Sequence, residues 1–238
     1  TLAERAREIL QAQGVWSQYL EVGIGPMAEI FTKSQPMSVV GLGAEVGLHP
    51  ESAWNNPEPE VVLAIDSKGR IRGCALGNDV KLRDFEGRSA LLLGQAKDNN
   101  ASCAIGPFVR LLDNDFTIEQ LRQLVVRLKV GGRDGFVMEG ESSLGAISRP
   151  LESLVSQLMG SCHQYPDGAF LFTGTMFSPT QDRDERDRGF THKPGDKVWI
   201  SSDHLGCLYN RVTTSDFAAP WTFGTMELMR NLAARKYI

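Results

Sequence analysis

The sequence predicts an α+β fold with a predominantly β core. From residue 36 onward, short apolar runs rich in β-branched residues are cut by Gly, Pro, Asn and Asp, which is typical of strands and turns. These runs do not alternate regularly with helical ones, as the strands of a parallel α/β fold would. No internal repeat with a period of roughly 20–50 residues is visible. With 238 residues and 42% hydrophobic content, the chain can form one main domain with its own core.

The first predicted elements are a helix and a β-hairpin. Residues 2–13 place apolar side chains on one helical stripe with charged side chains opposite, and Gly14 follows as a stop signal. Such a stripe indicates that the helix packs against another part of the molecule. Further along, the apolar runs 61–65 and 71–77 flank residues 67–69, whose Ser, Lys and Gly suit a turn. We therefore expect two paired antiparallel strands here.

The second half of the chain mixes helices with further strands. Thr117 is a suitable N-cap and Gln120 occupies the capping-box position, which predicts a helix over residues 117–128. Another helix is predicted over residues 150–159, where Gly160 acts as the stop. The remaining predicted elements are strands at residues 169–173, 197–201 and 205–212 and a closing helix near residues 226–235.

The stretch QDRDERDRG at residues 181–189 is the most loop-like part of the chain. Its charge density is typical of a solvated loop, and the functional alternative is a lid over a pocket. His163, His192 and His204 are scattered along the sequence, so we expect packing or surface histidines there rather than ligands.

Composition and charge exclude several classes of partner. The formal net charge is −4, and no dense cluster of Lys and Arg provides the positive surface that phosphate backbones require. The longest apolar runs fall far short of the roughly 20 residues needed to span a bilayer. The four cysteines are widely separated and form no CxxC pair, which is typical of a reduced, cytoplasmic protein. We therefore expect neither a nucleic acid nor a membrane as a partner.

Three acidic residues stand where the predicted hairpin begins and ends. Glu58 and Glu60 are two residues apart at the start of its first strand, so their side chains leave the same face. Asp79 ends the second strand, and hairpin pairing would return it to the same edge. Like charges this close repel unless a proton or a cation lies between them. Oxygen ligands with neither His nor Cys nearby favour Mg²⁺, with Mn²⁺ or Ca²⁺ as alternatives, over Zn²⁺. From spacing alone the Glu-x-Glu motif is weak, and a solvated acidic strand end is the more usual explanation of the pattern.

Five segments, taken together, resemble the fumarylacetoacetate hydrolase superfamily and follow that family's order. They are PEPEVVL, GNDVKLRDFEGRS, QAKDNNASCAIGPF, LFTGT and FTHKPGDKV, and the resemblance runs from about Glu29 to Val212. It implies a metal held by a Glu-x-Glu pair and an Asp, which fall on Glu58, Glu60 and Asp79. It also implies an α+β fold, a mixed β-sheet roll with flanking helices, assembled as a homodimer or a dimer of dimers.

Within this superfamily, the stretch LRDFEGRSALLLGQAKDNNASC most resembles the 2-keto-3-deoxy sugar acid (2-keto-3-deoxyarabinonate) dehydratase branch. The family's active-site lysine falls on Lys97. Many hydrolase members have a Thr four residues past this lysine, where this chain has Ala101, so a retained hydroxyl role would pass to Ser102. Hydrolase members also activate water with a His and Glu pair near the start of the domain. Residues 21–32 contain no His, which leaves Glu29 as the acid or base.

The resemblance and the acids together predict a metal-dependent lyase that dehydrates a small 2-oxo acid, a 2-keto-3-deoxy pentonate, through a metal-chelated enolate. Glu29 or a neutral Lys97 would remove the proton at C3 of the substrate. The predicted substrate-binding residues are Arg83, whose planar fork suits a carboxylate, and the polar Asn99, Ser102 and Thr175.

Several alternatives remain open at this stage. Arg83 could form a structural ion pair with Asp84 or Glu86. The enzyme could be a hydrolase that cleaves a C–C bond of a 2,4-diketo acid, such as an acylpyruvate or a diketo-deoxy sugar acid. A non-catalytic binding protein is a third reading, although a scaffold has no need of acids that repel one another.

The domain organisation is predicted from the change in residue composition along the chain, from a helical pattern to short β-type runs. We expect residues 1–28 to form an N-terminal helical segment, which could be the remnant of a smaller N-terminal domain. Residues 29–238 would form the catalytic domain.

Overall fold

The computed structural model describes residues 2–175 and 177–238. The strands are β1 (Glu45–Leu48), β2 (Asn55–Asn56), β3 (Pro59–Ile65), β4 (Ile71–Asp79), β5 (Lys81–Leu82), β6 (Cys103–Leu111), β7 (Val125–Gly131), β8 (Val137–Ser143), β9 (Ala169–Phe172), β10 (Lys197–Ser202) and β11 (Gly206–Thr214). The helices are α1 (Leu2–Ala12), α2 (Gln18–Ile24), α3 (Arg83–Arg88), α4 (Leu93–Lys97), α5 (Ile118–Arg122), α6 (Leu151–Leu158) and α7 (Thr225–Ala234).

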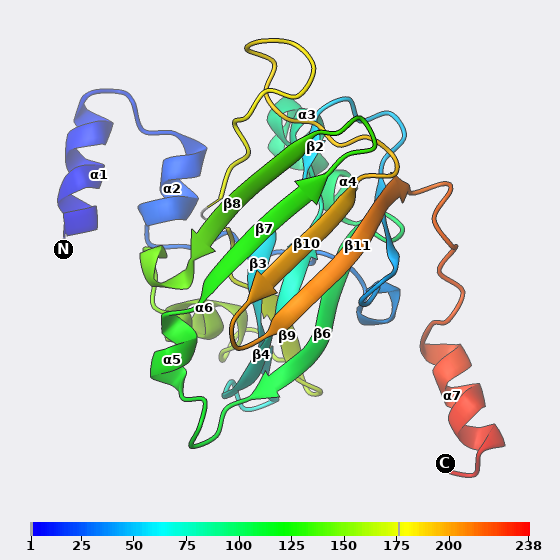
Figure 1. Cartoon of the computed structure of the whole chain (residues 1–238). Helices are drawn as coiled ribbons and strands as arrows, with labels where there is room; N and C mark the ends of the chain where they lie inside the picture. Colours follow the sequence, from blue (N-terminus) through cyan, green and yellow to red (C-terminus); the bar gives the residue numbers. More distant parts are fainter. Residues whose placement is uncertain (1, 176) are drawn as a thin grey trace.

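Two β-sheets packed against each other form the body of the molecule, and helices lie around their edges (Figure 1). One sheet has the order β1–β11–β10–β7–β8 and the other the order β6–β4–β3–β9, while β2 and β5 make a small third sheet. In the first sheet β1 runs parallel to β11, whereas its other strand pairs are antiparallel. The predicted α+β class with mixed sheets and flanking helices is therefore confirmed.

The burial of the strands follows their position in this arrangement. Along β7, Val126, Leu128 and Val130 are buried and the residues between them are exposed or half-buried, because one face of that strand meets water. Along β3, residues on both faces are buried. The core between the sheets is built from Val61, Leu63, Leu76, Val126, Leu128, Ile200 and Leu208, among others. β3 and β4, which carry the three acids, are thus held inside the most constrained part of the fold.

The predicted hairpin is confirmed. β3 and β4 are antiparallel neighbours, and the turn between them places Gly69 at φ +73°, a left-handed conformation that glycine adopts without strain. The predicted helix at residues 150–159 and the strands near 169, 197 and 205 are also present, as α6, β9, β10 and β11.

The helix predicted over residues 117–128 is right only at its start. Thr117 and Gln120 form the expected capping box, but α5 ends at Arg122 and β7 begins at Val125. The residues from 125 onward have a period-two alternation of buried and exposed side chains, and sheet pairing with β8 and β10 exploits it. Strand periodicity therefore overrides the helical signal of the cap.

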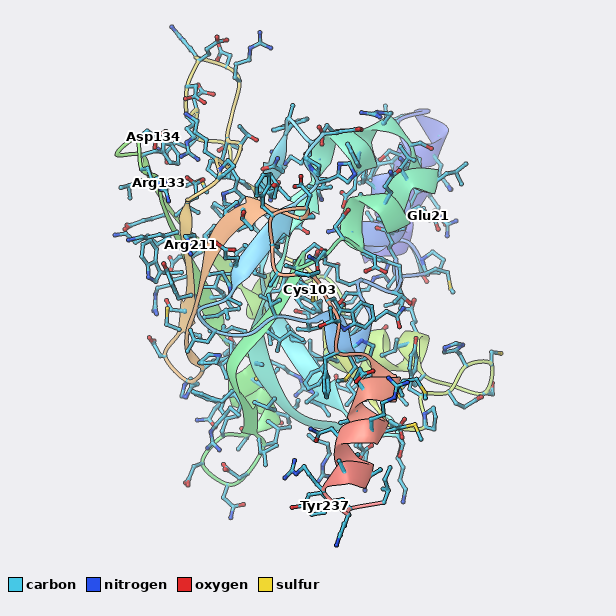
Figure 2. All side chains as sticks on the ribbon, turned by 90° about the vertical axis from the view of Figure 1, so that its right-hand side faces the viewer. Glu21, Cys103, Arg133, Asp134, Arg211 and Tyr237 are labelled. Atoms are coloured by element: carbon cyan, nitrogen blue, oxygen red, sulfur yellow. The ribbon has the colours of Figure 1, made fainter. Side chains whose placement is uncertain are left out.

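The terminal helices lie apart from the sheets. Ile9 of α1 is 50% exposed, so the predicted apolar stripe is only partly covered by the residues that the structure describes. Viewed from the side, α7 and its neighbour Tyr237 lie at the lower end of the molecule (Figure 2). The four cysteines are free thiols. Within the described ranges, no helix is both long and apolar enough to cross a membrane.

Candidate metal centre

The hairpin brings the three predicted acids together. Glu58 precedes β3, Glu60 is its second residue and Asp79 is the last residue of β4. The backbone N–H of Asp79 donates to the carbonyl of Glu58 at 3.1 Å, which locks the two strand ends side by side. One carboxylate oxygen from each residue lies within 4.8 Å of the other two. The predicted convergence is confirmed, and we call these residues the acid cluster.

Lys97, the last residue of α4, points its ammonium into the acid cluster. Its Nζ lies 2.8 Å from Glu58 Oε2, 3.0 Å from Asp79 Oδ2 and 3.3 Å from Glu86 Oε1, and its side chain is only 5% exposed. Burial by itself would lower the pKa of Lys97. The neighbouring carboxylates, Asp79 first, outweigh burial and hold that pKa well above its usual value.

Three charged residues of the site were not singled out from the sequence as site residues: Lys33, Lys81 and Glu86. Lys33 Nζ lies 2.9 Å from Asp79 Oδ1, and Lys81 Nζ lies 3.2 Å from Glu58 Oε1 and 2.9 Å from Glu86 Oε2. Lys81 follows Asp79 by two residues, and that spacing was a usable signal. Lys33 gave no local signal, because its partners lie at least 46 positions away along the chain.

Glu60 is the member of the acid cluster whose negative charge has no lysine beside it among the described residues. It is 3% exposed, and its Oε2 accepts a hydrogen bond from the backbone N–H of Gly174 at 2.7 Å. Burial, followed by the charges of Asp79 and Glu58, raises the pKa of Glu60 well above its usual value. Within residues 2–175 and 177–238, no cationic group lies within 4.0 Å of its carboxylate. A divalent cation with a preference for oxygen ligands fits this donor set.

Arg83 lies on one side of the site, at the start of α3. Its Nη2 donates to Ser178 Oγ at 2.8 Å, and its guanidinium lies over the ring of Trp54 at 5.3 Å. Asp84 instead accepts hydrogen bonds from the Ser52 hydroxyl and the Ala53 backbone N–H. In the described part of the chain, Arg83 makes no ion pair with Asp84 or Glu86. Its guanidinium instead donates to the segment that follows β9.

Thr175 lies close to the acid cluster through its neighbour. Gly174 contacts Glu60, and the Thr175 hydroxyl accepts a hydrogen bond from the backbone N–H of Phe177 at 3.1 Å. The predicted position of Thr175 beside a small ligand is compatible with this geometry.

Ser102 and Asn99 form the turn that follows Lys97. The Ser102 hydroxyl lies 2.6 Å from the carbonyl of Lys97 and 2.9 Å from that of Asn99, and it accepts from the Asn99 backbone N–H. The Asn99 side-chain amide donates to the carbonyl of Gln95 at 2.8 Å. Ala101 has φ +58°, so the turn is tight. The polar groups of Ser102 and Asn99, which we predicted to bind substrate, are therefore used in hydrogen bonds that stabilise the turn after Lys97.

Glu29 lies in the segment that crosses the site before β1. Its side chain is exposed, and within the described residues its carboxylate makes no polar contact. Phe31, two residues further on, has its ring 6.0 Å from Lys97 Nζ, and Lys33 reaches Asp79. The structure therefore brings the segment around Glu29 to the acid cluster. His49 packs against Phe85, with ring centroids 4.9 Å apart.

Comparison with known protein families yields a match that covers most of the chain. The model of the fumarylacetoacetate (FAA) hydrolase C-terminal family matches residues 18–213. The chain belongs to this family. The match begins in α2 and ends in β11, so it includes the acid cluster, Lys97 and both sheets.

Two relatives are dehydratases by name. The chain is 32% identical over 184 residues to 2-dehydro-3-deoxy-D-arabinonate dehydratase of Saccharolobus solfataricus, covering 77% of this chain and 58% of that protein. It is 31% identical over 214 residues to the probable 2-keto-3-deoxyxylonate dehydratase of Haloferax volcanii, covering 90% and 69%. The chain thus spans less than two thirds of the length of the first relative.

A solved structure extends the similarity to three dimensions. A 2-keto-3-deoxy-D-arabinonate dehydratase complexed with magnesium and 2,5-dioxopentanoate superimposes with a TM-score of 0.72 at 33% identity, covering 83% of this chain and 66% of that one. A 5-carboxymethyl-2-hydroxymuconate delta-isomerase from Mycobacterium smegmatis, at 21% identity and a TM-score of 0.56, shares the fold alone.

Proposed function

We propose that this protein is a metal-dependent hydro-lyase that dehydrates a 2-keto-3-deoxy sugar acid, a pentonate. The observation that carries the proposal is the convergence of Glu58, Glu60 and Asp79 on Lys97 at one end of the hairpin. The similarity to two named dehydratases supports the choice of reaction. Buried acids that repel one another are costly to a fold, which argues for a role in binding a cation.

Glu58, Glu60 and Asp79 would hold the metal, with Mg²⁺ as the first choice and Mn²⁺ or Ca²⁺ as alternatives. When bound, a divalent cation polarises a 2-oxo acid and makes the protons at C3 more acidic. The 2-oxo acid would lie between the acid cluster and the Trp54 side of the site, where the Arg83 guanidinium can pair with its carboxylate. Thr175 would donate a hydrogen bond to the substrate from the opposite segment.

Two groups would carry the proton transfers. Glu29 is exposed and its carboxylate is available to take the proton from C3. Lys97, surrounded by carboxylates that favour its protonated form, would give a proton to the leaving C4 hydroxyl. The C3–H and C4–O bonds break, a C3=C4 double bond forms, and the hydroxyl leaves as water. Loss of a proton from C5 and return of a proton to C3 then give an enol at C5, which tautomerises to the dioxo product. Asn99 and Ser102 would act by fixing the turn that carries Lys97.

An NMR-monitored turnover assay tests the reaction. Purified protein with Mg²⁺ is offered 2-keto-3-deoxypentonates and a 2,4-diketo acid in parallel. Loss of water with formation of a dioxo product supports the dehydratase. Pyruvate or another cleaved acid makes the protein a C–C hydrolase instead. No turnover of either substrate, with metal bound, contradicts both and favours the non-catalytic reading.

Proton exchange separates the roles of Glu29 and Lys97. In D₂O, a Glu29→Gln variant should lose both deuterium incorporation at C3 and elimination, because the base is absent. A Lys97→Met variant should retain C3 exchange and lose elimination, because the acid is absent. The reverse pattern would assign the base to Lys97. Sedimentation of the same preparations tests the predicted homodimer or dimer of dimers.

A further inference from the structure

Lys33 is a second buried lysine at the acid cluster. Its Nζ lies 2.9 Å from Asp79 Oδ1, and the side chain is 9% exposed. The same ammonium donates to the backbone carbonyl of Lys97 at 2.6 Å and to that of Val80 at 3.3 Å. Two backbone carbonyls therefore hold Lys33 in place independently of its contact with Asp79.

In both Asp79 and Glu58, the two oxygens of the carboxylate contact different lysines. Asp79 Oδ2 and Glu58 Oε2 both contact Lys97 Nζ, at 3.0 and 2.8 Å, and so face the same point. The second oxygen of each carboxylate contacts a different lysine: Asp79 Oδ1 meets Lys33 and Glu58 Oε1 meets Lys81. Each carboxylate thus has one oxygen directed at the shared point and one oxygen held by a lysine of its own.

Lys33 and Lys81 differ in how strongly the surrounding structure fixes their ammonium groups. Lys33 is nearly buried and is anchored by backbone carbonyls. The Lys81 side chain is 29% exposed, and its ammonium contacts only carboxylate side chains, those of Glu58 and Glu86. A lysine fixed to the backbone keeps its position when the cluster binds a cation, whereas a solvent-facing lysine can move away.

We propose that Lys33 restricts Asp79 to binding a metal through a single oxygen and thereby favours Mg²⁺ over Ca²⁺ at this site. Mg²⁺ requires nearly octahedral coordination by single oxygen ligands, whereas Ca²⁺ accepts six to eight oxygens and readily takes a carboxylate through both. With Oδ1 held by Lys33, Asp79 would offer a cation its other oxygen, Oδ2, which faces the shared point and also contacts Lys97. This inference rests on the metal site of the proposed function, and it makes Lys33 a positioning residue that acts through Asp79.

Calorimetric titration of the metal-free protein with Mg²⁺ and with Ca²⁺ measures the preference directly. The wild-type protein should bind Mg²⁺ more tightly than Ca²⁺. In Lys33→Met, Asp79 gains its second oxygen, so the Mg²⁺-to-Ca²⁺ preference should fall about tenfold, the size of effect expected from a residue that orients a metal ligand. Lys81→Met should change the preference less. Lys68→Met, in the exposed turn of the hairpin, should leave it unchanged.

The outcomes separate this inference from the proposed function. Equal weakening of both metals in Lys33→Met overturns the inference, because loss of structure or charge alone would act on both. If Lys33→Met does not fold, Lys33→Gln, which keeps a donor for the carbonyl of Lys97 but removes the charge, should show the same fall in preference. A wild-type protein that binds Ca²⁺ at least as tightly as Mg²⁺ overturns the inference without any variant. A wild-type protein that binds neither cation removes the metal site itself, and the inference with it.

Discussion

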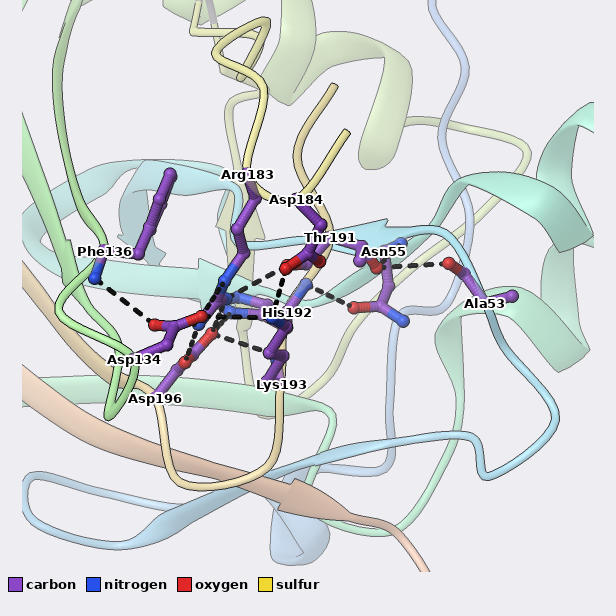
Figure 3. A network of polar contacts seen from close by, with 10 residues as sticks. All are labelled: Ala53, Asn55, Asp134, Phe136, Arg183, Asp184, Thr191, His192, Lys193 and Asp196. Atoms are coloured by element: carbon purple, nitrogen blue, oxygen red, sulfur yellow. Dashed lines mark hydrogen bonds and ion pairs between the residues drawn. The ribbon is translucent and has the colours of Figure 1, made fainter. Parts of the chain in front are cut away.

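The fold contains two buried groups of charges, and they are balanced differently. The first is the acid cluster with its lysines. The second, the Arg183 network, consists of Arg183, Asp196 and His192 with the more exposed Asp134, Lys193 and Asp184 (Figure 3). The side chains of Arg183 and Asp196 are each 1% exposed and pair through two bonds, Nη1 to Oδ2 at 2.6 Å and Nη2 to Oδ1 at 2.7 Å. His192 Nδ1 also lies 3.0 Å from Asp196 Oδ2.

In the buried part of the Arg183 network, one acid faces one cation, since Arg183 pairs with Asp196 and both side chains are 1% exposed. The other members, Asp134, Lys193 and Asp184, pair at the surface, and their side chains are at least 36% exposed. Burial lowers the pKa of His192, so its ring stays neutral and adds no charge. The network also ties the segment after β9 to β2, since the His192 backbone N–H donates to Asn55 Oδ1 at 3.2 Å. A balanced cluster of this kind serves the fold.

Around the acid cluster, four carboxylates, those of the cluster and of Glu86, face three lysine ammonium groups. Glu58, Asp79 and Glu86 share Lys33, Lys81 and Lys97, while Glu60 has a backbone N–H as its donor. The surplus negative charge is what a divalent cation would neutralise. The comparison teaches that charge balance, rather than burial, distinguishes a group of ions that holds the fold from one prepared for a ligand. Changes in the first should affect stability and changes in the second should affect binding and turnover.

The largest effect is expected at Lys97. Lys97→Met should lower the turnover of a 2-keto-3-deoxypentonate by about 10²–10⁴-fold, the range expected when a general acid is removed. Steady-state kinetics measure this, with circular dichroism to check folding and Lys68→Met as the control lysine. Turnover that stays at the wild-type level would show that the acid cluster is not the catalytic centre.

A comparable effect, on stability instead, is expected in the Arg183 network. Asp196→Asn leaves the buried Arg183 with only the more exposed Asp134 as a partner charge and should destabilise the fold by about 3–5 kcal/mol. Urea unfolding measures this. The matched control is Asp203→Asn, which breaks an exposed pair with Arg127 and should cost far less, because water screens exposed charges. Similar losses in the two variants would contradict the structural role of the network.

Glu60 should show a stability effect of the opposite sign. Because burial and neighbouring acids raise its pKa, the ionised carboxylate opposes folding, and metal-free Glu60→Gln should be at least as stable as the wild type. Mg²⁺ at about 100 times its dissociation constant should stabilise the wild type by about 2.7 kcal/mol and the variant by far less. Thermal unfolding with and without Mg²⁺ tests this, and equal stabilisation of both proteins would exclude Glu60 as a ligand.

The smallest effect is the pH dependence of the Arg183 network. Burial alone would raise the pKa of Asp196, but hydrogen bonds from Arg183 and His192 lower it to about 2. A carboxyl group with a depressed folded-state pKa stabilises the protein above its unfolded pKa, about 3.9, and that contribution is lost as the pH falls toward 2. The loss should amount to about 2 kcal/mol. NMR titration of the Asp196 carboxyl carbon measures the pKa, and a midpoint near 4 would contradict the pairing.

The site was partly predictable from the sequence because the relevant pattern is local. Glu58 and Glu60 share a face through the alternation of a strand, and a short turn at Gly69 is enough to return Asp79 to them. The capping box at Thr117 was likewise readable from a few neighbouring residues. The extent of α5 was not, because sheet pairing of the residues from 125 onward decided where the helix ends.

The sequence by itself therefore determined the fold class, the hairpin and the three acids, since alternation, turns and caps act between residues close in the chain. Tertiary structure alone decided the rest of the charge arrangement. Arg183 lies in a stretch that is typical of a solvated loop, yet its side chain is buried against Asp196. Lys33 reaches Asp79 from 46 residues away. Such contacts depend on the packing of distant segments, which no local pattern encodes.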